Sequence, residues 1–318
     1  MPDANGDLED SFRVRCDGRE GLGAESALVR ARRGLRDPGC RCGRQGEGWR
    51  VNGVGARTEP WRFKTVRKEP PAAMVESPAD MGLPPEKQDA RQMRAMFCAI
   101  APKYDLVTRI FSYGMDSRWK RAGVNACALP ANAVVLDLAA GTGDFSKLVL
   151  ARLPNARAVA VDVTERMLRE AREGGVREAV CGDASALPFG DAAFDCVFVG
   201  YGLRNFPNLK GALREIERVT RPGGRIVSLD FFLPANAIFR RCYLVYLFMQ
   251  GALWGLLLHG RARTYTYIPD SLRSFMSVEA FSAMLEEAGY EKVAARSFIL
   301  GGIGLHSAVK RVFAGTAD

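Results

Sequence analysis

Residues 134–146 read VVLDLAAGTGDFS, an apolar run that ends in a turn containing Gly141 and Gly143. The apolar run predicts a buried β-strand, and the residues after the turn predict a helix that continues to about residue 153. Because glycine has no side chain, the backbone of such a turn can approach a ligand closely. Open α/β sheets bind ligands at the carboxyl ends of their strands, and this turn lies at such an end.

Strands and helices alternate along the rest of the chain. Four further strands are expected at residues 158–164, 178–184, 194–202 and 223–232. Helices at 165–175 and 209–220 lie between them, and helical pieces broken near Pro102 and Gly114 precede the first strand. This alternation predicts an α/β fold of the Rossmann-like class with a mostly parallel, doubly wound sheet.

Acidic residues distinguish between two ligand classes that use this arrangement. Asp162 ends the second strand, 21 positions after Gly141, where an acid hydrogen-bonds ribose hydroxyls. A dinucleotide site has a third glycine where this chain has Ser146, and it offers a pyrophosphate the helix N-terminus that here carries Asp144. A carboxylate there is compatible with the cationic, phosphate-free S-adenosylmethionine. Asp183 adds an acceptor for the adenine amino group, which completes a predicted S-adenosylmethionine site.

Both of these last acids have a purely structural alternative. Asp144 could be only a helix cap, and Asp183 could be only a turn residue. We favour the cofactor site because the acids follow one another on successive strand ends.

Residues 1–85 differ from the rest of the chain. They are rich in Gly, Arg, Asp, Glu and Pro and have no apolar periodicity. Such a composition cannot bury enough apolar surface to offset chain entropy, so we expect a disordered segment. A reading frame that truly starts at Met74 or Met81 is an alternative explanation. Residues 86–318 are expected to form the folded domain.

The net charge of +9 favours contact with an anionic surface. The basic residues form no known nucleic-acid motif, so we expect an anionic membrane surface as the partner and no nucleic acid. Eight cysteines without a CxxC pair and two histidines assemble no zinc-ligand pattern, so no metal is expected. The first ten residues include four acids, unlike a signal peptide, and we expect a cytoplasmic, peripherally membrane-associated protein.

Five blocks occur in a fixed order along the chain. They are IAPKYDLVTRIFSYGMDSRWKR (100–121), LDLAAGTGD (136–144), DASALPFGDAAFD (183–195), GYGLRN (200–205) and RVTRPGGRIVSLDF (218–231). In this order they resemble the ubiquinone/menaquinone biosynthesis C-methyltransferases of the UbiE/MenG type, over about residues 88–310. The second block is shared by many methyltransferases, whereas the first and fourth are much more specific.

The resemblance implies that residues 86–318 are a class I S-adenosylmethionine-dependent methyltransferase domain. The acceptor would be a ring carbon of a polyprenylated quinol, either demethylmenaquinol or a 2-methoxy-6-polyprenyl-1,4-benzoquinol. By position, it implies cofactor contacts from Thr142, Asp162, Asp183 and Ala184. The predicted cofactor site also includes Asp137, Gly141, Gly143 and Gly200.

The chain departs from the family pattern at several positions. Thr108 stands where Asn is usual, Gly200 where a Ser is often found, and Asp230-Phe231-Phe232 where Glu-x-Ser is usual. These departures leave the exact acceptor open.

The predicted catalytic residues are Arg204, Asn205 and Tyr104. A ring carbon next to a hydroxyl becomes nucleophilic when that hydroxyl loses its proton. A guanidinium beyond the fourth strand could stabilise the resulting oxygen anion, and an amide could orient it. Tyr104 could attract the sulfonium through its aromatic face. Alternatively, Arg204 merely pairs with a surface acid and Tyr104 only packs.

Residues 242–258 read CYLVYLFMQGALWGLLL, which is apolar on all sides. A membrane-spanning helix needs about 20 residues, and a span here would separate the last strands from the sheet. We therefore expect an interfacial or pocket-covering helix that suits a polyprenyl tail, with a plain core helix as the alternative.

Two other functions compete with quinol methylation. One is methylation of another small lipophilic or phenolic acceptor, and the other is a non-catalytic nucleotide-binding module. A homodimer is compatible with the sequence.

Overall fold

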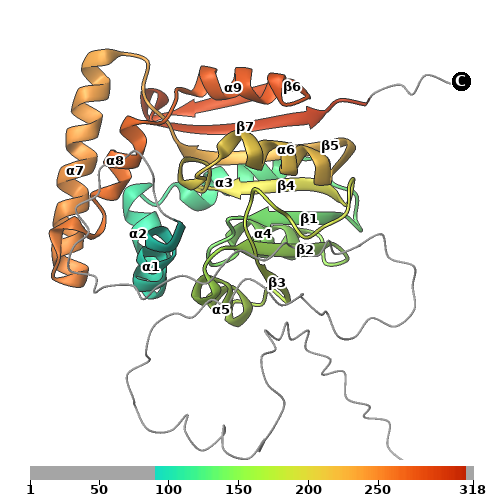
Figure 1. The fold of residues 1–318 in the computed structure, drawn as a ribbon, viewed down its shortest axis with the longest axis horizontal. Helices are drawn as coiled ribbons and strands as arrows, with labels where there is room; N and C mark the ends of the chain where they lie inside the picture. The colour runs from blue at the N-terminus through green and yellow to red at the C-terminus, as the bar shows by residue number, and fades with distance from the viewer. Residues whose placement is uncertain (1–89, 313–318) are drawn as a thin grey trace, which may run out of the picture.

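A computed structural model describes residues 90–312 of the chain, and its centre is a seven-stranded sheet with the order β3-β2-β1-β4-β5-β7-β6 (Figure 1). Strands β1 to β5 pair in parallel, and β7 pairs antiparallel with both β5 and β6. The bounds are β1 Val134–Leu138, β2 Arg157–Asp162, β3 Glu178–Cys181, β4 Phe194–Gly200, β5 Thr220–Phe231, β6 Tyr290–Phe298 and β7 Ile303–Lys310. The predicted mostly parallel α/β fold is confirmed.

Helices cover both faces of the sheet and one of its ends. The α-helices are α1 Ala90–Ile100, α2 Tyr104–Phe111, α3 Asp116–Ala126, α4 Asp144–Arg152, α5 Glu165–Glu173, α6 Leu209–Val219, α7 Ala237–His259, α8 Tyr267–Arg273 and α9 Val278–Glu287. Short 3-10 helices are η3 Ala101–Lys103, η4 Leu203–Asn205, η5 Ala262–Thr264 and η6 Ile299–Gly301. Helices α1, α2, α7 and α8 lie together at one end of the sheet (Figure 1).

Strand β1 is apolar except for the buried Asp137, because both of its faces are buried. Val135 belongs to the core on the side of α3 and α4, where Phe145 of α4 stacks on Phe198 of β4 at 4.9 Å. Leu136 and Leu138 belong to the core on the side of α6 and α9. Such a continuous apolar run is typical of a central parallel strand.

The largest difference from the predicted elements is at the start of β5. The sequence predicts a helix to residue 220 and a turn at 221–224, whereas α6 ends at Val219 and β5 already begins at Thr220. Thr220 pairs with Phe194, and the register then shifts before Cys196 pairs with Arg225. The predicted turn is therefore an irregular part of the strand, in which Gly223 has a φ of 75°. The predicted breaks near Pro102 and Gly114 are confirmed.

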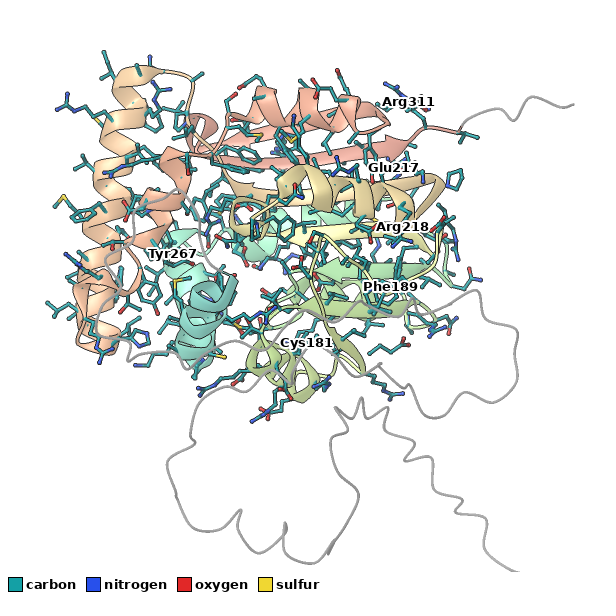
Figure 2. All side chains as sticks on the ribbon, viewed as in Figure 1. Cys181, Phe189, Glu217, Arg218, Tyr267 and Arg311 are labelled. Atoms are coloured by element: carbon teal, nitrogen blue, oxygen red, sulfur yellow. The ribbon has the colours of Figure 1, made fainter. Side chains whose placement is uncertain are left out.

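Arg218 of α6 fixes the connection between β3 and β4. Its guanidinium donates to the carbonyl oxygens of Phe189 at 2.8 Å and Leu187 at 3.2 Å, and it forms ion pairs with Asp191 and Glu215 (Figure 2). One side chain thus holds the loop that follows the third strand against the sheet. The segment predicted to be disordered, residues 1–85, lies outside the described residues.

Gly143 offers a test of how tightly the turn after β1 is packed. Its φ is 81°, and a Cβ there would lie 2.8 Å from Val176 and 3.2 Å from Ala171. We expect Gly143→Ala to destabilise the fold by about 1–2 kcal/mol through its backbone conformation and by about 1–3 kcal/mol more through overpacking. Urea unfolding would measure the change.

Gly114→Ala is the matched control, because Gly114 also has a positive φ, 72°, but has open space around the new Cβ. It should incur only the backbone cost. Equal losses in the two variants would mean that the contact with Val176 is unimportant.

Candidate active site

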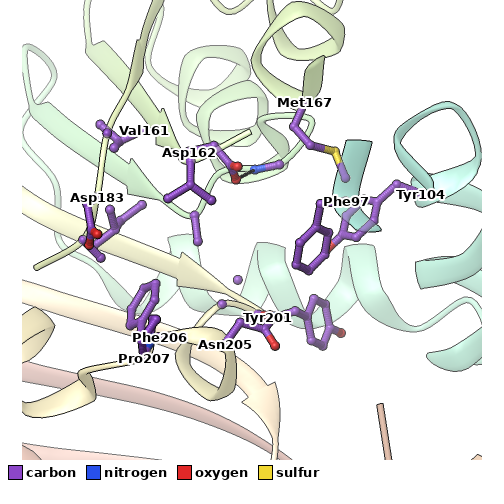
Figure 3. Close-up of a pocket in the computed structure, with 18 residues that line it drawn as sticks. Phe97, Tyr104, Val161, Asp162, Met167, Asp183, Tyr201, Asn205, Phe206 and Pro207 are labelled. Carbon is purple, nitrogen blue, oxygen red and sulfur yellow. Dashed lines mark hydrogen bonds between the residues drawn. The ribbon is translucent and has the colours of Figure 1, made fainter. Parts of the chain in front are cut away.

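A cavity of about 780 Å³, including the space at its mouth, lies at the carboxyl ends of β1, β2 and β4. Asp162 and Asp183 lie on one side of it, and Phe97, Tyr104 and Tyr201 lie on the other (Figure 3). Seven residues predicted from sequence line it, namely Tyr104, Gly141, Asp162, Asp183, Ala184, Gly200 and Asn205.

Asp162 is held in place by the backbone that follows two strands. Its Oδ2 accepts a hydrogen bond from the Gly141 amide at 2.9 Å, and its Oδ1 accepts one from the Thr164 amide at 2.8 Å. Burial raises the pKa of this carboxyl, and the two amides oppose the rise. Since each carboxylate oxygen can accept a second bond, Asp162 can still bind the two hydroxyls of a ribose.

Asp183 stabilises the turn after β3 and also lines the cavity. Its Oδ1 accepts bonds from the amide and the hydroxyl of Ser185, both at 2.8 Å. The turn role that the sequence left as an alternative is therefore present, but Asp183 lines the cavity as well.

Asp137, Thr142 and Gly143 are not among the residues that line the cavity, so their direct contact with the cofactor stays a prediction. Asp137 lies buried below the turn, where its Oδ2 accepts bonds from the amide and the hydroxyl of Ser146 at 2.8 and 2.9 Å. The Thr142 hydroxyl donates to Asp105 at 2.8 Å, which fastens the N-terminal helices to the turn.

Asp144 also differs from expectation, because its carboxylate is paired with a lysine that it shares with Asp116. Lys120 of α3 lies 2.6 Å from Asp144 and 2.8 Å from Asp116. The argument that Asp144 repels a phosphate therefore loses its force. The lining of the cavity gives a stronger argument against a phosphate-containing ligand. Its described residues include two carboxylates and no lysine or arginine. That charge suits a cationic ligand such as S-adenosylmethionine and disfavours a pyrophosphate.

A second cavity of about 380 Å³ adjoins the first. Its lining includes six aromatic side chains, namely Tyr104, Phe111, Tyr201, Phe231, Tyr265 and Tyr267. Tyr104 and Tyr201 line both cavities, so these two rings form the boundary between them.

Arg204 lines this second cavity and not the first. Its Nη1 lies 2.5 Å from Oδ1 of Asp230, and both side chains are almost fully buried. Burial disfavours the charged guanidinium, but Asp230 more than compensates, and the pKa of Arg204 is raised. Arg204 thus pairs with an acid, but the predicted alternative of a surface acid is wrong, because Asp230 is buried at the end of β5.

Comparison with known proteins gives the family. Residues 86–310 match the ubiE/COQ5 methyltransferase family. The chain belongs to this family. The resemblance inferred from the five sequence blocks is confirmed, and with it the assignment as an S-adenosylmethionine-dependent methyltransferase. The alternative of a non-catalytic nucleotide-binding module is not supported.

Individual relatives agree with the family assignment. The chain is 36% identical over 234 residues to the ubiquinone/menaquinone biosynthesis C-methyltransferase UbiE of Pseudomonas fluorescens strain Pf0-1, which covers 71% of this chain and 91% of that one. The enzyme of the same name from Pseudomonas putida is 36% identical over 237 residues, with the same coverage.

Solved structures share the fold at low sequence identity. An S-adenosylmethionine-dependent methyltransferase from Thermotoga maritima has a TM-score of 0.50 and 18% identity, covering 69% of this chain and all of that one. The cyclase SpnF has a TM-score of 0.51 and 18% identity, covering 72% of this chain and 98% of that one. Because a cyclase shares the fold, these neighbours support the fold alone.

Several residues of the site were missed in the sequence. Asp230 could have been found, since it is an acid at the carboxyl end of a strand, as Asp162 is. Phe97 and Met167 line the cofactor cavity from α1 and α5, and nothing in an ordinary amphipathic helix distinguishes them. Lys120 was equally invisible, because its partner Asp144 lies 24 residues away on another helix.

The buried Asp137 predicts a specific pH dependence of stability. Burial raises its pKa from 3.8 to about 7. Since the folded state then binds more protons than the unfolded state, Asp137 costs stability as the pH rises from about 4 to 7, by up to about 4 kcal/mol. Asp137→Asn removes this cost and keeps an oxygen acceptor for Ser146.

The free energy of unfolding of Asp137→Asn minus that of the wild type should therefore increase with pH across this range. Chemical denaturation at several pH values measures it. A difference that stays constant with pH would show that Asp137 titrates at an ordinary value.

Proposed function

We propose that this protein transfers the methyl group of S-adenosylmethionine to a ring carbon of a polyprenylated quinol, in the biosynthesis of menaquinone, ubiquinone or both. The relatives that carry this activity in their names support the substrate class. The observation that carries the proposal is a buried arginine with an unused donor, in an aromatic cavity that adjoins the cofactor cavity.

The cofactor cavity binds and orients the methyl donor. When bound, S-adenosylmethionine supplies a methyl carbon attached to a positively charged sulfur. Asp162 would hold the ribose, and Asp183 would accept a bond from the adenine amino group. The Tyr104 ring lies 3.5 Å from the position of a Cβ on Gly141, so it covers the turn and offers an aromatic face to a cation.

The acceptor cavity and the adjoining part of the cofactor cavity have the donors and acceptors that a quinol ring needs, because Arg204 lines the first and Asn205 lines the second. Arg204 Nε and Asn205 Oδ1 are buried and have no hydrogen-bond partner within residues 90–312. Unpaired buried polar atoms cost about 1–3 kcal/mol each, and a ligand that pairs with them recovers this free energy. The ring oxygen of a quinol would accept from Arg204, and a ring hydroxyl would donate to Asn205. The guanidinium would then stabilise the negative charge that develops on the ring oxygen.

Helix α7 borders the acceptor cavity. Tyr265 lines that cavity, and a Cβ on Gly251 of α7 would lie 2.8 Å from the Tyr265 carbonyl oxygen. An apolar prenyl tail that leaves the cavity would therefore meet the apolar side chains of α7.

The outer face of α7 would contact an anionic membrane. By length and composition α7 could cross a membrane. However, its buried residues Tyr243, Leu247, Gly251 and Gly255 recur every four positions and pack on the domain. Strands β5 and β7, which pair with each other, lie on either side of it in the sequence. We therefore infer that α7 lies along the membrane surface and does not span it.

The opposite face of α7 has the composition of a membrane contact. Its large exposed apolar side chains are Ile238, Val245, Phe248, Met249, Leu253, Leu256 and Leu257. Exposed arginines at both ends of the helix, Arg241, Arg261 and Arg263, would meet anionic headgroups. A homodimer would have to use another surface.

Arg204 gives the test of the catalytic proposal. Because Arg204→Ala alone would leave Asp230 buried and unpaired, we choose Arg204→Gln combined with Asp230→Asn. Single-turnover methyl transfer to a short-chain quinol analogue should fall by roughly 10²–10³-fold, as after loss of an oxyanion donor. Calorimetric affinity for S-adenosylmethionine should hardly change.

Two comparisons make this test specific. Arg204→Lys keeps a charge opposite Asp230 but lacks the planar fork, so it should recover only part of the rate. Asp230→Asn alone keeps the guanidinium and should retain more activity than the double variant. If turnover and cofactor affinity are lost in parallel, Arg204 is structural and the catalytic role is wrong.

Membrane contact is tested on the outer face of α7. Leu257→Glu should weaken binding to vesicles that contain phosphatidylglycerol by roughly tenfold, since one buried leucine contributes about 1.5–3 kcal/mol. Val312→Glu is the matched control, because Val312 is 64% exposed and Leu257 is 63% exposed. Equal effects of the two variants in a sedimentation assay would remove α7 from the interface.

A further inference from the structure

Tyr201 lies between the cofactor cavity and the acceptor cavity and lines both. It is buried, and its hydroxyl has no hydrogen-bond partner within the described part of the chain. Its φ of 57° is in the left-handed region, which a bulky residue adopts only when its surroundings enforce it. The fold therefore holds an unpaired hydroxyl at the point where the two substrates would meet.

A charged cluster lies behind this hydroxyl. Lys120 Nζ is 2.8 Å from Oδ2 of Asp116, 2.6 Å from Oδ2 of Asp144 and 5.4 Å from the centre of the Tyr201 ring. The other oxygen of Asp116, Oδ1, is buried without a partner among residues 90–312. An unused carboxylate oxygen and an unused hydroxyl thus belong to one cluster.

Asp116 acts on the Tyr201 hydroxyl directly. Burial raises the pKa of Tyr201 well above its ordinary value, and Asp116 is the next cause, through its charge and through its interaction with the hydroxyl. Tyr201 is therefore protonated, and Asp116 is the carboxylate that acts on it most strongly.

We propose that Tyr201 and Asp116 form a proton relay that ionises the hydroxyl of the acceptor ring. This proposal rests on the function proposed above and adds a base to it. The acceptor hydroxyl passes its proton to Tyr201 Oη while the Tyr201 proton passes to Asp116 Oδ1. The electron pair of the broken O–H bond stays on the ring oxygen, beside Arg204.

The remaining steps restore the relay. The ortho carbon uses that electron pair to bond the methyl carbon, whose bond to sulfur breaks with its electrons left on sulfur. The ring carbon then loses its hydrogen to water as a proton, and Asp116 returns a proton through Tyr201 to the ring oxygen. One proton is released in total, and every residue regains its starting state. Asp116, at 13% side-chain exposure, is also open to exchange with water.

The other tyrosines of the acceptor cavity have different surroundings. The Tyr265 hydroxyl is bonded to His259 at 2.8 Å. Tyr104 neighbours Asp105, but that carboxylate accepts from Thr142. Burial raises the pKa of Tyr267, and the neighbouring charge of Arg204 opposes the rise. Within the described residues, the cluster around Lys120 thus combines the unpaired Tyr201 hydroxyl with the unpaired Oδ1 of Asp116.

The relay is tested with two acceptors that differ in acidity. Single-turnover transfer is measured with a short-chain quinol analogue and with a fluorinated analogue whose hydroxyl is already ionised at the assay pH. Tyr201→Phe and Asp116→Asn should each slow transfer to the first analogue by roughly 10²-fold, the usual contribution of a general base. Transfer to the ionised analogue should stay close to the wild-type rate.

Two variants control for packing and charge. Tyr290→Phe removes another buried tyrosine hydroxyl, on the far side of the sheet, and should leave both rates unchanged. Asp144→Asn removes the other carboxylate from Lys120, so any change should be the same for both acceptors. Equal losses on both acceptors in Tyr201→Phe would overturn the relay while leaving quinol methylation intact. A wild type that methylates neither acceptor would overturn the proposed function and the relay with it.

Binding gives a second readout that needs no turnover. Without S-adenosylmethionine, Tyr201→Phe should weaken calorimetric affinity for the hydroxyl analogue by roughly threefold to tenfold, the effect of one hydrogen bond. Affinity for the O-methyl ether of the same analogue should not change, because the ether has no proton to donate to Tyr201. An equal loss for both compounds would make Tyr201 a packing residue.

Discussion

A carboxylate buried at the carboxyl end of a strand must be hydrogen-bonded, and this constraint shapes both cavities. Asp162 takes the amides of Gly141 and Thr164, and Asp137 takes the amide of Ser146. Asp230 takes the amides of Leu203 and Phe231 together with the Arg204 guanidinium. Most of the bonded amides belong to the turn or the helical start that follows a strand, namely Gly141, Ser146, Thr164 and Leu203. Satisfying the buried acids therefore fixes the loops that bind the ligands.

The parts of the site that were predictable follow from the spacing between the glycine turn after β1 and the end of β2. Asp162 and Gly141 were found because a strand end and a glycine turn have a fixed geometric relation in this fold. Lys120 could not be found, since its contact with Asp144 depends on how α3 packs against α4. The same holds for the pair of Arg204 and Asp230: each lies at a recognisable strand end, but only the sheet order brings those ends together.

Helix α7 shows a second reason why some features could not be predicted from the sequence. Its sequence is apolar on every side, so periodicity does not reveal which face is buried. The buried face is set by Gly251 and Gly255, where added Cβ atoms would lie 2.8 and 2.6 Å from carbonyl oxygens of the segment that follows α7. Close backbone packing, which needs small residues, thus decides the orientation and leaves the larger side chains outside. A count of apolar residues alone does not distinguish whether such a helix lies in the core or at the surface.

The charges of the two cavities are opposite, and this bears on which step the enzyme accelerates. Carboxylates line the cofactor cavity, and a guanidinium lines the acceptor cavity. When a ring anion attacks a sulfonium, both charges disappear, so fixed charges on both sides stabilise the reactants more than the transition state for methyl transfer. Arg204 therefore gains nothing for the enzyme if the acceptor arrives as an anion. It helps when the acceptor arrives as a neutral quinol, because the anion must then be created inside the cavity. A protonated tyrosine also lies at the boundary of the two cavities. This arrangement favours ionisation of the acceptor before the methyl group is transferred.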